Sequence, residues 1–362
     1  MSSETVAYFP PETRAMPLTL IRTERLLPVP GKVLVSAGER VQASQTIAQA
    51  EISGEVRIVN VARLLRVPPA RVARLLKVKE GDDVTTNTII AARGLLPSGR
   101  VLSPTNGFVY RVDKAKGRVL IKVVVPPFDL TAYLSGTVAN VMSGRGVVIE
   151  TTGALVQATV GFGGEAFGVL HVVAHDPADV LRTKSVDVTA HGAILVGGAW
   201  IEEGALQQAA QLQVRGIIAG SMDGRLIDLA HTLPFPILLT EGLGRIPMSR
   251  PIFKLLQSQS GREASISALT RTRWGVQRPE ILIPLPADSK PAAPVALGTP
   301  LTIGVRVRVV RGSLQGAAGT VATIPDRPMQ IGSGARVYGA EIDLEDVGRA
   351  FVAFANLEIL RG

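Results

Sequence analysis

The stretch AILVGGAWIEEGALQQAAQLQV, residues 193–214, decides the central fold of this chain. It opens with four apolar residues, turns at a pair of glycines and continues with apolar residues at helical spacing. That order predicts a strand, a turn and an amphipathic helix. The pattern recurs in RGIIAGSMDGRLIDLAHTL (215–233) and in PFPILLTEGLGRIPMSRPIFKLLQSQ (234–259). Alternating strands and helices predict a parallel sheet with right-handed crossovers over residues 191–286, which a further strand from Ala264 would complete.

A small ligand in such a sheet binds beyond the carboxyl ends of the strands. The residues expected at these ends are Gly197, Gly198, Ser221, Glu241 and Arg245. Helix N-termini together with Arg245 would hold a small anion there, and Ser221 and Ser249 are also expected helix caps. The first turn is not G-x-G-x-x-G, and no nucleophile–base pair can be assigned, so we predict no cofactor and favour a non-enzyme. The arrangement is similar to a swivelling β/α domain, which implies docking against other domains.

Towards the N-terminus, GERVQASQTIA (38–48) and GDDVTTNTIIA (81–91) share one pattern. Each has a glycine turn, a valine, a polar gap and an Ile-Ala pair. This internal repeat resembles the barrel-sandwich hybrid of lipoyl and biotinyl domains, which implies such a domain over residues 18–130 behind a tail at 1–17. A lipoyl carrier would place its lysine between Ala91 and Ser103, where this chain has none. The resemblance therefore implies a structural platform rather than a carrier.

A basic helical insert is predicted at residues 60–79, NVARLLRVPPARVARLLKVK. Asn60 would cap a first short helix, and Pro69 suits the first turn of a second one. The residues left on the exposed face are Arg63, Arg66, Arg71, Arg74 and Lys77. These side chains would suit a phosphate backbone. Two other interpretations stay open: a helix-turn-helix that reads DNA bases, and a packed insert whose basic face is only solvated.

The C-terminal stretch RVRVVRGSLQGAAGTVATIP (306–325) alternates apolar and polar residues around three spaced glycines. It resembles a KOW motif, a module of transcription elongation factors and ribosomal proteins. The resemblance implies an SH3-like barrel over residues 301–362 that contacts RNA or protein. Its candidate nucleic-acid contacts are Arg306, Arg308 and Arg311. Because the same module carries Glu341, Asp343, Glu345 and Asp346, it is nearly neutral, so we expect it to dock a protein or to contact RNA only alongside the basic insert.

Two segments connect these parts. Residues 131–190 are β-branched and glycine-punctuated, which predicts a β-rich segment. Residues 287–300, ADSKPAAPVALGTP, form an extended Pro- and Ala-rich linker. The fold class is therefore multidomain α/β plus β.

Composition limits the function. The net charge is +9, and residues 1–130 alone carry 19 basic against 11 acidic side chains, or +8. The absence of cysteine excludes disulfides and thiolate metal sites. Aromatic residues are only 4%, which argues against sequence-specific single-strand binding. No leader-like segment and no run of 18 apolar residues is present, so we expect a cytoplasmic protein that does not enter a membrane.

Three functional hypotheses follow. The favoured one is a non-enzymatic KOW-domain factor associated with RNA, the ribosome or the transcription machinery. The second is a small-ligand-binding protein or enzyme with its site over the parallel sheet. The third is a structural assembly subunit that self-associates or binds partners through the edges of its barrels.

Overall fold

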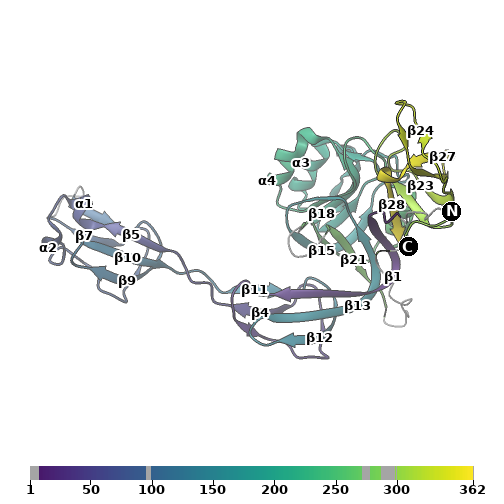
Figure 1. Ribbon diagram of the computed structural model, residues 1–362. Helices are drawn as coiled ribbons and strands as arrows, with labels where there is room; N and C mark the ends of the chain where they lie inside the picture. Colours follow the sequence, from purple (N-terminus) through teal and green to yellow (C-terminus); the bar gives the residue numbers. More distant parts are fainter. Residues whose placement is uncertain (1–7, 95–98, 271–277, 287–297, 299, 362) are drawn as a thin grey trace, which may run out of the picture.

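A computed structural model describes residues 8–94, 99–270, 278–286, 298 and 300–361 (Figure 1). The described chain is rich in strands, with one large mixed sheet and several small sheets. The expected combination of β and α/β structure is therefore confirmed at this level. Most of the predicted linker at 287–300 lies outside the described residues. None of the described helices has the length and apolar character needed to cross a membrane.

The central sheet contains the predicted parallel strands. Four neighbouring strands are parallel: β15 (Glu165–Val172), β16 (Ala193–Val196), β18 (Gly216–Met222) and β19 (Ile237–Leu243). Three antiparallel strands flank them: β14 (Val160–Phe162), β20 (Glu263–Ser267) and β21 (Glu280–Pro284). The strand predicted from Ala264 is present as β20, but it is antiparallel to its neighbours, so the expected parallel sheet does not extend to it. Glu263 pairs with Val169 in the second half of β15, so β20 starts near the edge at which the parallel strands end.

Helices cover both faces of the central sheet. They are α3 (Glu203–Gln211), α4 (Ile227–Thr232) and α5 (Arg250–Ser258). In β16, Leu195 packs into the core beneath α3 and α4, whereas Ile194 and Val196 pack into the core beneath α5. Because successive side chains of a strand point to opposite faces, the continuous apolar run of β16 fits a sheet that is buried on both sides. The central domain has three layers, helix, sheet and helix.

The long strand β1 (Glu12–Leu26) joins the central sheet to the C-terminal part of the chain. It is antiparallel to β13 (Gly146–Gln157), which in turn pairs with β21, and parallel to β28 (Leu357–Arg361). The predicted tail at 1–17 is therefore wrong from Glu12 onward. Thr13 and Ala15 are buried by these pairings, which a loose tail would not achieve.

The N-terminal repeat builds two lobes rather than one. The proximal lobe comprises residues 27–50 and 128–149, and the distal lobe comprises residues 56–123. Extended segments at 51–55 and 124–127 join them, and the distal lobe stands apart from the rest of the chain (Figure 1). Each lobe contains one copy of the repeat and has its own hydrophobic core. The chain forms the first strands of the proximal lobe, then the whole distal lobe, and then returns to form the remaining strands of the proximal lobe.

The strands of the proximal lobe come from the residues before and after the distal lobe in the sequence. They are β2 (Lys32–Val33), β3 (Arg40–Val41), β4 (Thr46–Ala50), β11 (Phe128–Thr131) and β12 (Gly136–Met142). β4 pairs with β11 and β3 pairs with β12, so residues beyond 130 complete this lobe. The predicted β-rich segment at 131–190 is accordingly divided between the proximal lobe and the central sheet.

The described residues of the distal lobe, 56–94 and 99–123, form six strands and two short helices. The strands are β5 (Val56–Asn60), β6 (Asp83–Val84), β7 (Ile89–Ala92), β8 (Arg100–Leu102), β9 (Gly107–Asp113) and β10 (Arg118–Val123). The helices are α1 (Val61–Leu65) and α2 (Pro69–Val72). The predicted cap is confirmed, because the Asn60 side chain accepts a hydrogen bond of 3.0 Å from the Arg63 amide. The helix-turn-helix interpretation is wrong, because α2 is a single turn of four residues and cannot serve as a recognition helix.

The C-terminal lobe, residues 301–361, is a compact set of strands around one core. The strands are β22 (Arg306–Val309), β23 (Ala318–Thr323), β24 (Met329–Gln330), β25 (Arg336–Val337), β26 (Gly339–Leu344), β27 (Gly348–Ala353) and β28. Gly312 and Gly316 lie in the turn between β22 and β23 with φ of 92° and 90°, a backbone region that favours glycine. The predicted glycine-dependent loop between two strands is confirmed.

Arg308 is buried where the C-terminal lobe meets the central sheet. Its side chain is 1% exposed and pairs with Glu358 at 2.7 Å and with Glu241 at 3.3 Å. The guanidinium also donates to the Thr240 carbonyl and to the hydroxyls of Thr13 and Thr159. The prediction that Arg308 contacts nucleic acid is therefore wrong. Arg308 lies in the alternating sequence RVRV, which does not reveal that this side chain is buried between the C-terminal lobe and the central sheet.

Two further groups complete this buried network. Arg278 donates to Glu358 at 2.6 Å, and Glu241 accepts a hydrogen bond of 3.0 Å from the amide of Ser249 at the start of α5. Burial by itself would raise the pKa of Glu358, but Arg308, the Thr13 hydroxyl and Arg278 outweigh it and lower the pKa. Burial raises the pKa of Glu241, although Arg308 and the Ser249 amide oppose it. Two arginines and two glutamates give a neutral cluster in the middle of the molecule.

A second polar group lies where β1 leaves the central sheet. Arg25 of β1 donates twice to Glu165 of β15 at 2.9 Å, and its guanidinium lies 5.0 Å from the ring centre of Tyr133. Glu165 and Glu280 each pair with Ser267 of β20, so their strands bring the two carboxyl groups to one row of the sheet. Burial, and then the charge of Glu165, raise the pKa of Glu280 to about 7.

Replacing Arg308 should destabilise the protein strongly. Arg308→Met leaves the buried Glu241 without a cation, and loss of one partner of a buried pair costs about 3–5 kcal/mol in the free energy of unfolding. The matched control is Arg349→Met, because Arg349 pairs with Asp343 on the exposed surface of the same lobe. The control should change stability by less than about 1 kcal/mol. Urea unfolding followed by tryptophan fluorescence measures both, and equal midpoints would contradict the role of Arg308.

Replacing Glu280 should remove a stability loss at neutral and alkaline pH. The folded-state pKa of Glu280, about 7, exceeds the ordinary value of a glutamate. The contribution of Glu280 to the free energy of unfolding is therefore fully present below about pH 4.5, and it is lost as the pH rises through 7. Glu280→Gln should be more stable than the wild type at pH 8, by up to about 3 kcal/mol, and equally stable near pH 4.5.

Thermal unfolding at a series of pH values tests this expectation. The control Glu203→Gln, at an exposed position of α3, should leave the wild-type pH profile unchanged. A Glu280→Gln profile parallel to that of the wild type would show that this carboxyl group does not titrate as described.

Candidate nucleic-acid interface

The distal lobe carries the positive charge of the whole chain. Residues 56–123 contain 14 lysines and arginines against four aspartates and glutamates, a net charge of +10. Since the chain as a whole is +9, all other residues together carry −1. The charge gradient noted in the sequence is therefore a property of one lobe, and this lobe is joined to the rest of the chain by only two extended segments (Figure 1).

Three of the four carboxylates of the distal lobe accept hydrogen bonds from backbone amides of its turns. Glu80 accepts from the Val112 amide at 2.7 Å, Asp82 from the Lys79 amide at 2.8 Å and Asp113 from the Lys116 amide at 3.1 Å. These bonds hold the loops in shape. In the described parts of the lobe, Arg57 pairs with Glu55 on the surface, and the three turn carboxylates form no ion pair with a side chain.

A cluster of exposed cations forms at the end of the lobe that carries α1 and α2. The turn between β9 and β10 packs against α1, because the Ala62 amide donates to the Gly117 carbonyl at 3.0 Å. A Cβ at Gly117 would lie 2.8 Å from that of Ala62, so glycine permits this close approach. We call the resulting cluster the basic tip; it comprises Arg63, Arg66, Arg71, Arg74, Lys114 and Lys116, all of them exposed.

The basic tip is open to a polyanion. Arg66 adopts the left-handed conformation, φ 54° and ψ 49°, at the end of α1, which turns the chain between the two helices. The four arginines of the tip have no carboxylate partner in the part of the chain that the structure describes. Lys77, three residues after Arg74, is also exposed. All five predicted contacts of the insert are therefore accessible to a ligand.

The predicted arginines of the C-terminal lobe are not part of this cluster. Arg306 pairs with Glu345 at 2.5 Å on the surface, Arg308 is buried, and Arg311 is exposed. The C-terminal lobe and the distal lobe lie at opposite ends of the molecule (Figure 1). The structure thus brings together the predicted contacts of the insert and separates them from the predicted contacts of the C-terminal stretch.

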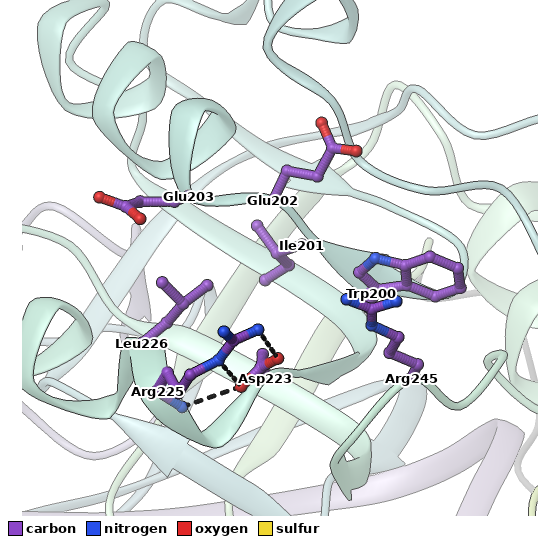
Figure 2. A pocket seen from close by; sticks show the side chains of 8 residues that line it. All are labelled: Trp200, Ile201, Glu202, Glu203, Asp223, Arg225, Leu226 and Arg245. Carbon is purple, nitrogen blue, oxygen red and sulfur yellow. Dashed lines mark hydrogen bonds and ion pairs between the residues drawn. The ribbon is translucent and has the colours of Figure 1, made fainter.

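A shallow cleft lies at the predicted ligand-binding edge of the central sheet. It has a volume of about 330 Å³ and is lined by Trp200, Ile201, Glu202, Glu203, Asp223, Arg225, Leu226 and Arg245. Figure 2 shows the Arg245 guanidinium against the Trp200 ring, 5.7 Å from its centre, and Arg225 hydrogen-bonded to Asp223. The hydrogen bonds from Arg225 hold the pKa of Asp223 well below its usual range. This carboxylate is therefore ionised and paired near neutral pH, which does not suit a general acid.

Of the five predicted ligand residues, only Arg245 lines the cleft. Ser221 instead holds the loop after β19, donating to the Ile246 carbonyl and accepting from the Ile246 amide, and so it is not the predicted helix cap. Ser249 precedes α5, but its side chain forms no capping bond. Glu241 belongs to the buried network around Arg308.

The two predicted glycines are needed for packing. A Cβ at Gly198 would lie 2.4 Å from the Asp176 carbonyl oxygen, and one at Gly197 would lie 3.1 Å from Leu181. The loop before β16 therefore occupies the space in which a bound phosphate would have to approach these glycines. Their conformation serves the contact between loop and sheet.

Sequence reasoning missed Lys114 and Lys116 as members of the basic tip. Both lie in the tight turn DKAKG between β9 and β10, which is readable in the sequence. Their position beside α1 depends on the contact between Ala62 and Gly117, across more than fifty residues, and no local pattern predicts it. No protein-family model matches this chain, and no curated protein matches its sequence.

Proposed function

We propose that the protein is a non-enzymatic factor that binds RNA through the phosphate backbone with its distal lobe, and that its central and C-terminal parts bind a protein partner, as in a ribonucleoprotein. We further infer that the proximal and distal lobes are barrel-sandwich hybrids. In the same way, we infer a swivelling-type central domain and a KOW-like SH3 barrel at the C-terminus.

The observation that carries this proposal is the separation of charge. A net charge of +10 on one small lobe creates a field that attracts phosphate, while the remainder of the chain at −1 contributes no attraction. Neutralising a phosphate with a lysine or arginine releases condensed counterions, which supplies most of the sequence-independent affinity. Six exposed cations at the basic tip would bind several phosphates at once.

RNA is the polyanion favoured by the C-terminal resemblance. The glycine-dependent loop of the KOW-like stretch connects β22 and β23, and modules of that family contact RNA or protein. In this chain, however, Arg306 is already paired and Arg308 is buried. The C-terminal lobe is therefore better suited to dock a protein, while the distal lobe supplies the contact with RNA.

The proposal predicts which arginines matter for RNA binding. Changing Arg63, Arg66, Arg71 and Arg74 to Gln should weaken binding to RNA at low salt at least tenfold. The matched control removes four arginines from the C-terminal lobe: Arg306, Arg311, Arg327 and Arg336. Both variants lose the same charge, but the control should bind within about threefold of the wild type, because its arginines lie far from the basic tip.

Fluorescence anisotropy with a labelled RNA over a range of salt concentrations measures this difference. Each lost phosphate contact should reduce the slope of log affinity against log salt by about 0.7 for a single strand. The basic-tip variant should thus show a clearly shallower slope. Equal losses in the two variants would contradict the division of roles, and no RNA binding by the wild type at low salt would refute the function.

A further inference from the structure

The distal lobe contains two aromatic side chains, Phe108 and Tyr110, and neither belongs to its core. The described core consists of aliphatic residues such as Val119 and Ile121, both fully buried. Tyr110 is 55% exposed, and Phe108 is half-buried. Large aromatic side chains gain most by burial inside a domain. Their position at the surface, in a chain with few aromatics, indicates a face that binds something.

Strand pairing places both aromatics on the outer side of the sheet formed by β5, β10, β9 and β6. In β10 the buried residues Val119 and Ile121 alternate with Leu120 and Lys122, which point away from the core. Lys122 pairs with Phe108 on one side and with Val56 on the other, and Leu120 pairs with Ile58. Ile58 is 60% exposed, so this side of the sheet is uncovered.

A β-bulge turns Tyr110 to the same side. Leu120 pairs with Arg111 and the next residue, Ile121, pairs with Val109, so Tyr110 is an extra residue in β9. Val109 is buried and Val112 packs against the core, which leaves Tyr110 and Arg111 together on the exposed side. Bulges commonly redirect side chains in this way. We call this surface the outer face; it comprises Val56, Ile58, Phe108, Tyr110, Arg111, Arg118, Leu120 and Lys122.

Cations surround the aromatics on the outer face. Lys122 lies beside Phe108, and Arg111 follows Tyr110 in β9. Arg118 is half-buried, and its Nε is enclosed without a hydrogen-bond partner among the described residues. Two acidic side chains also lie in these rows: Asp83 is opposite Phe108, and Asp113 is opposite Arg118. Aromatic rings interleaved with cations match a ligand that offers both flat apolar rings and negative charge.

We propose that the outer face binds single-stranded nucleic acid, with bases stacked on Phe108 and Tyr110 and phosphates held by Arg111, Arg118 and Lys122. This inference rests on the proposed RNA-binding function of the distal lobe and names the form of nucleic acid that it takes. Residues two apart in a strand are separated by roughly 6–7 Å, about twice the ~3.4 Å rise per nucleotide of a stacked strand. Two bases on these rings would therefore belong to an extended, unstacked strand.

A duplex does not satisfy this geometry, because its bases are stacked on one another and do not expose their flat faces. Stacking on aromatic side chains tolerates every base. The proposed binding is therefore independent of sequence, which agrees with the small number of aromatics in the chain. The basic tip at the end of the same lobe would extend the path of the phosphate backbone beyond the outer face.

The test uses the full-length protein and three labelled probes of about 20 units each: oligo(U) RNA, the same backbone without bases, and an RNA duplex. The wild type should bind oligo(U) about tenfold or more tighter than the abasic strand, because each stacked base contributes about a factor of ten. The variant Phe108→Leu with Tyr110→Leu keeps the apolar surface but loses the rings. It should bind oligo(U) and the abasic strand equally, with unchanged affinity for the duplex.

The matched control is Tyr338→Leu, because Tyr338 in the C-terminal lobe is 58% exposed, much like Tyr110. It should bind all three probes as the wild type does. If the wild type does not distinguish oligo(U) from the abasic strand, stacking is refuted while the proposed RNA binding stands. If no probe binds at about 50 mM salt, the proposed function itself fails.

A protein contact at the outer face is the remaining alternative outcome. If the double leucine variant binds every probe as the wild type does but changes its sedimentation at equal concentration, the face serves self-association. That result would overturn the proposal.

Discussion

The buried guanidinium of Arg308 is the interaction on which the arrangement of the central parts depends. It extends from β22 into a site formed by β1, β19 and β28, with Glu241 and Glu358 as its carboxylate partners. A buried cation is costly unless its charge is matched and its donors are used. Here both conditions are met only when the C-terminal lobe, the N-terminal strand and the central sheet are together. A side chain of this kind contributes little as a local contact, but it penalises every other relative position of the three parts.

The position of the lobes follows from this junction. β1 begins beside β28 and pairs with β13 from Ala15 to Leu26, so these two strands lead from the network to the proximal lobe. Arg25, near the end of β1, is tied to Glu165 of the central sheet. The proximal lobe is therefore anchored to the central domain by strands, whereas the distal lobe is attached only by residues 51–55 and 124–127. The most highly charged part of the chain is also the part with the fewest contacts to the rest.

Local patterns predicted much of this fold. The strands and helices between Ala193 and Ser258, the capping of α1 by Asn60 and the glycine loop after β22 could all be read from spacing and residue type. The nesting of one lobe within the other could not, because β4 pairs with β11 across about eighty residues and each half of the repeat has the same pattern. The burial of Arg308 was equally hidden, since an arginine alternating with valines on a strand normally marks the solvent side. The insert arginines were found because helical spacing exposes them; Tyr110 was missed because its orientation depends on a bulge.

The charge distribution connects these structural features to function. If the +10 of the distal lobe were spread over the whole surface, the central domain would also be drawn to phosphate, and any protein partner would compete with nucleic acid for it. Because the rest of the chain carries a net charge of −1, the positive charge that would attract phosphate is confined to the distal lobe. The neutral cluster around Arg308 contributes to this separation, because its two arginines are cancelled by Glu241 and Glu358 inside the molecule. The strongly basic lobe and the nearly neutral remainder of the chain therefore lie in separate parts of the molecule (Figure 1).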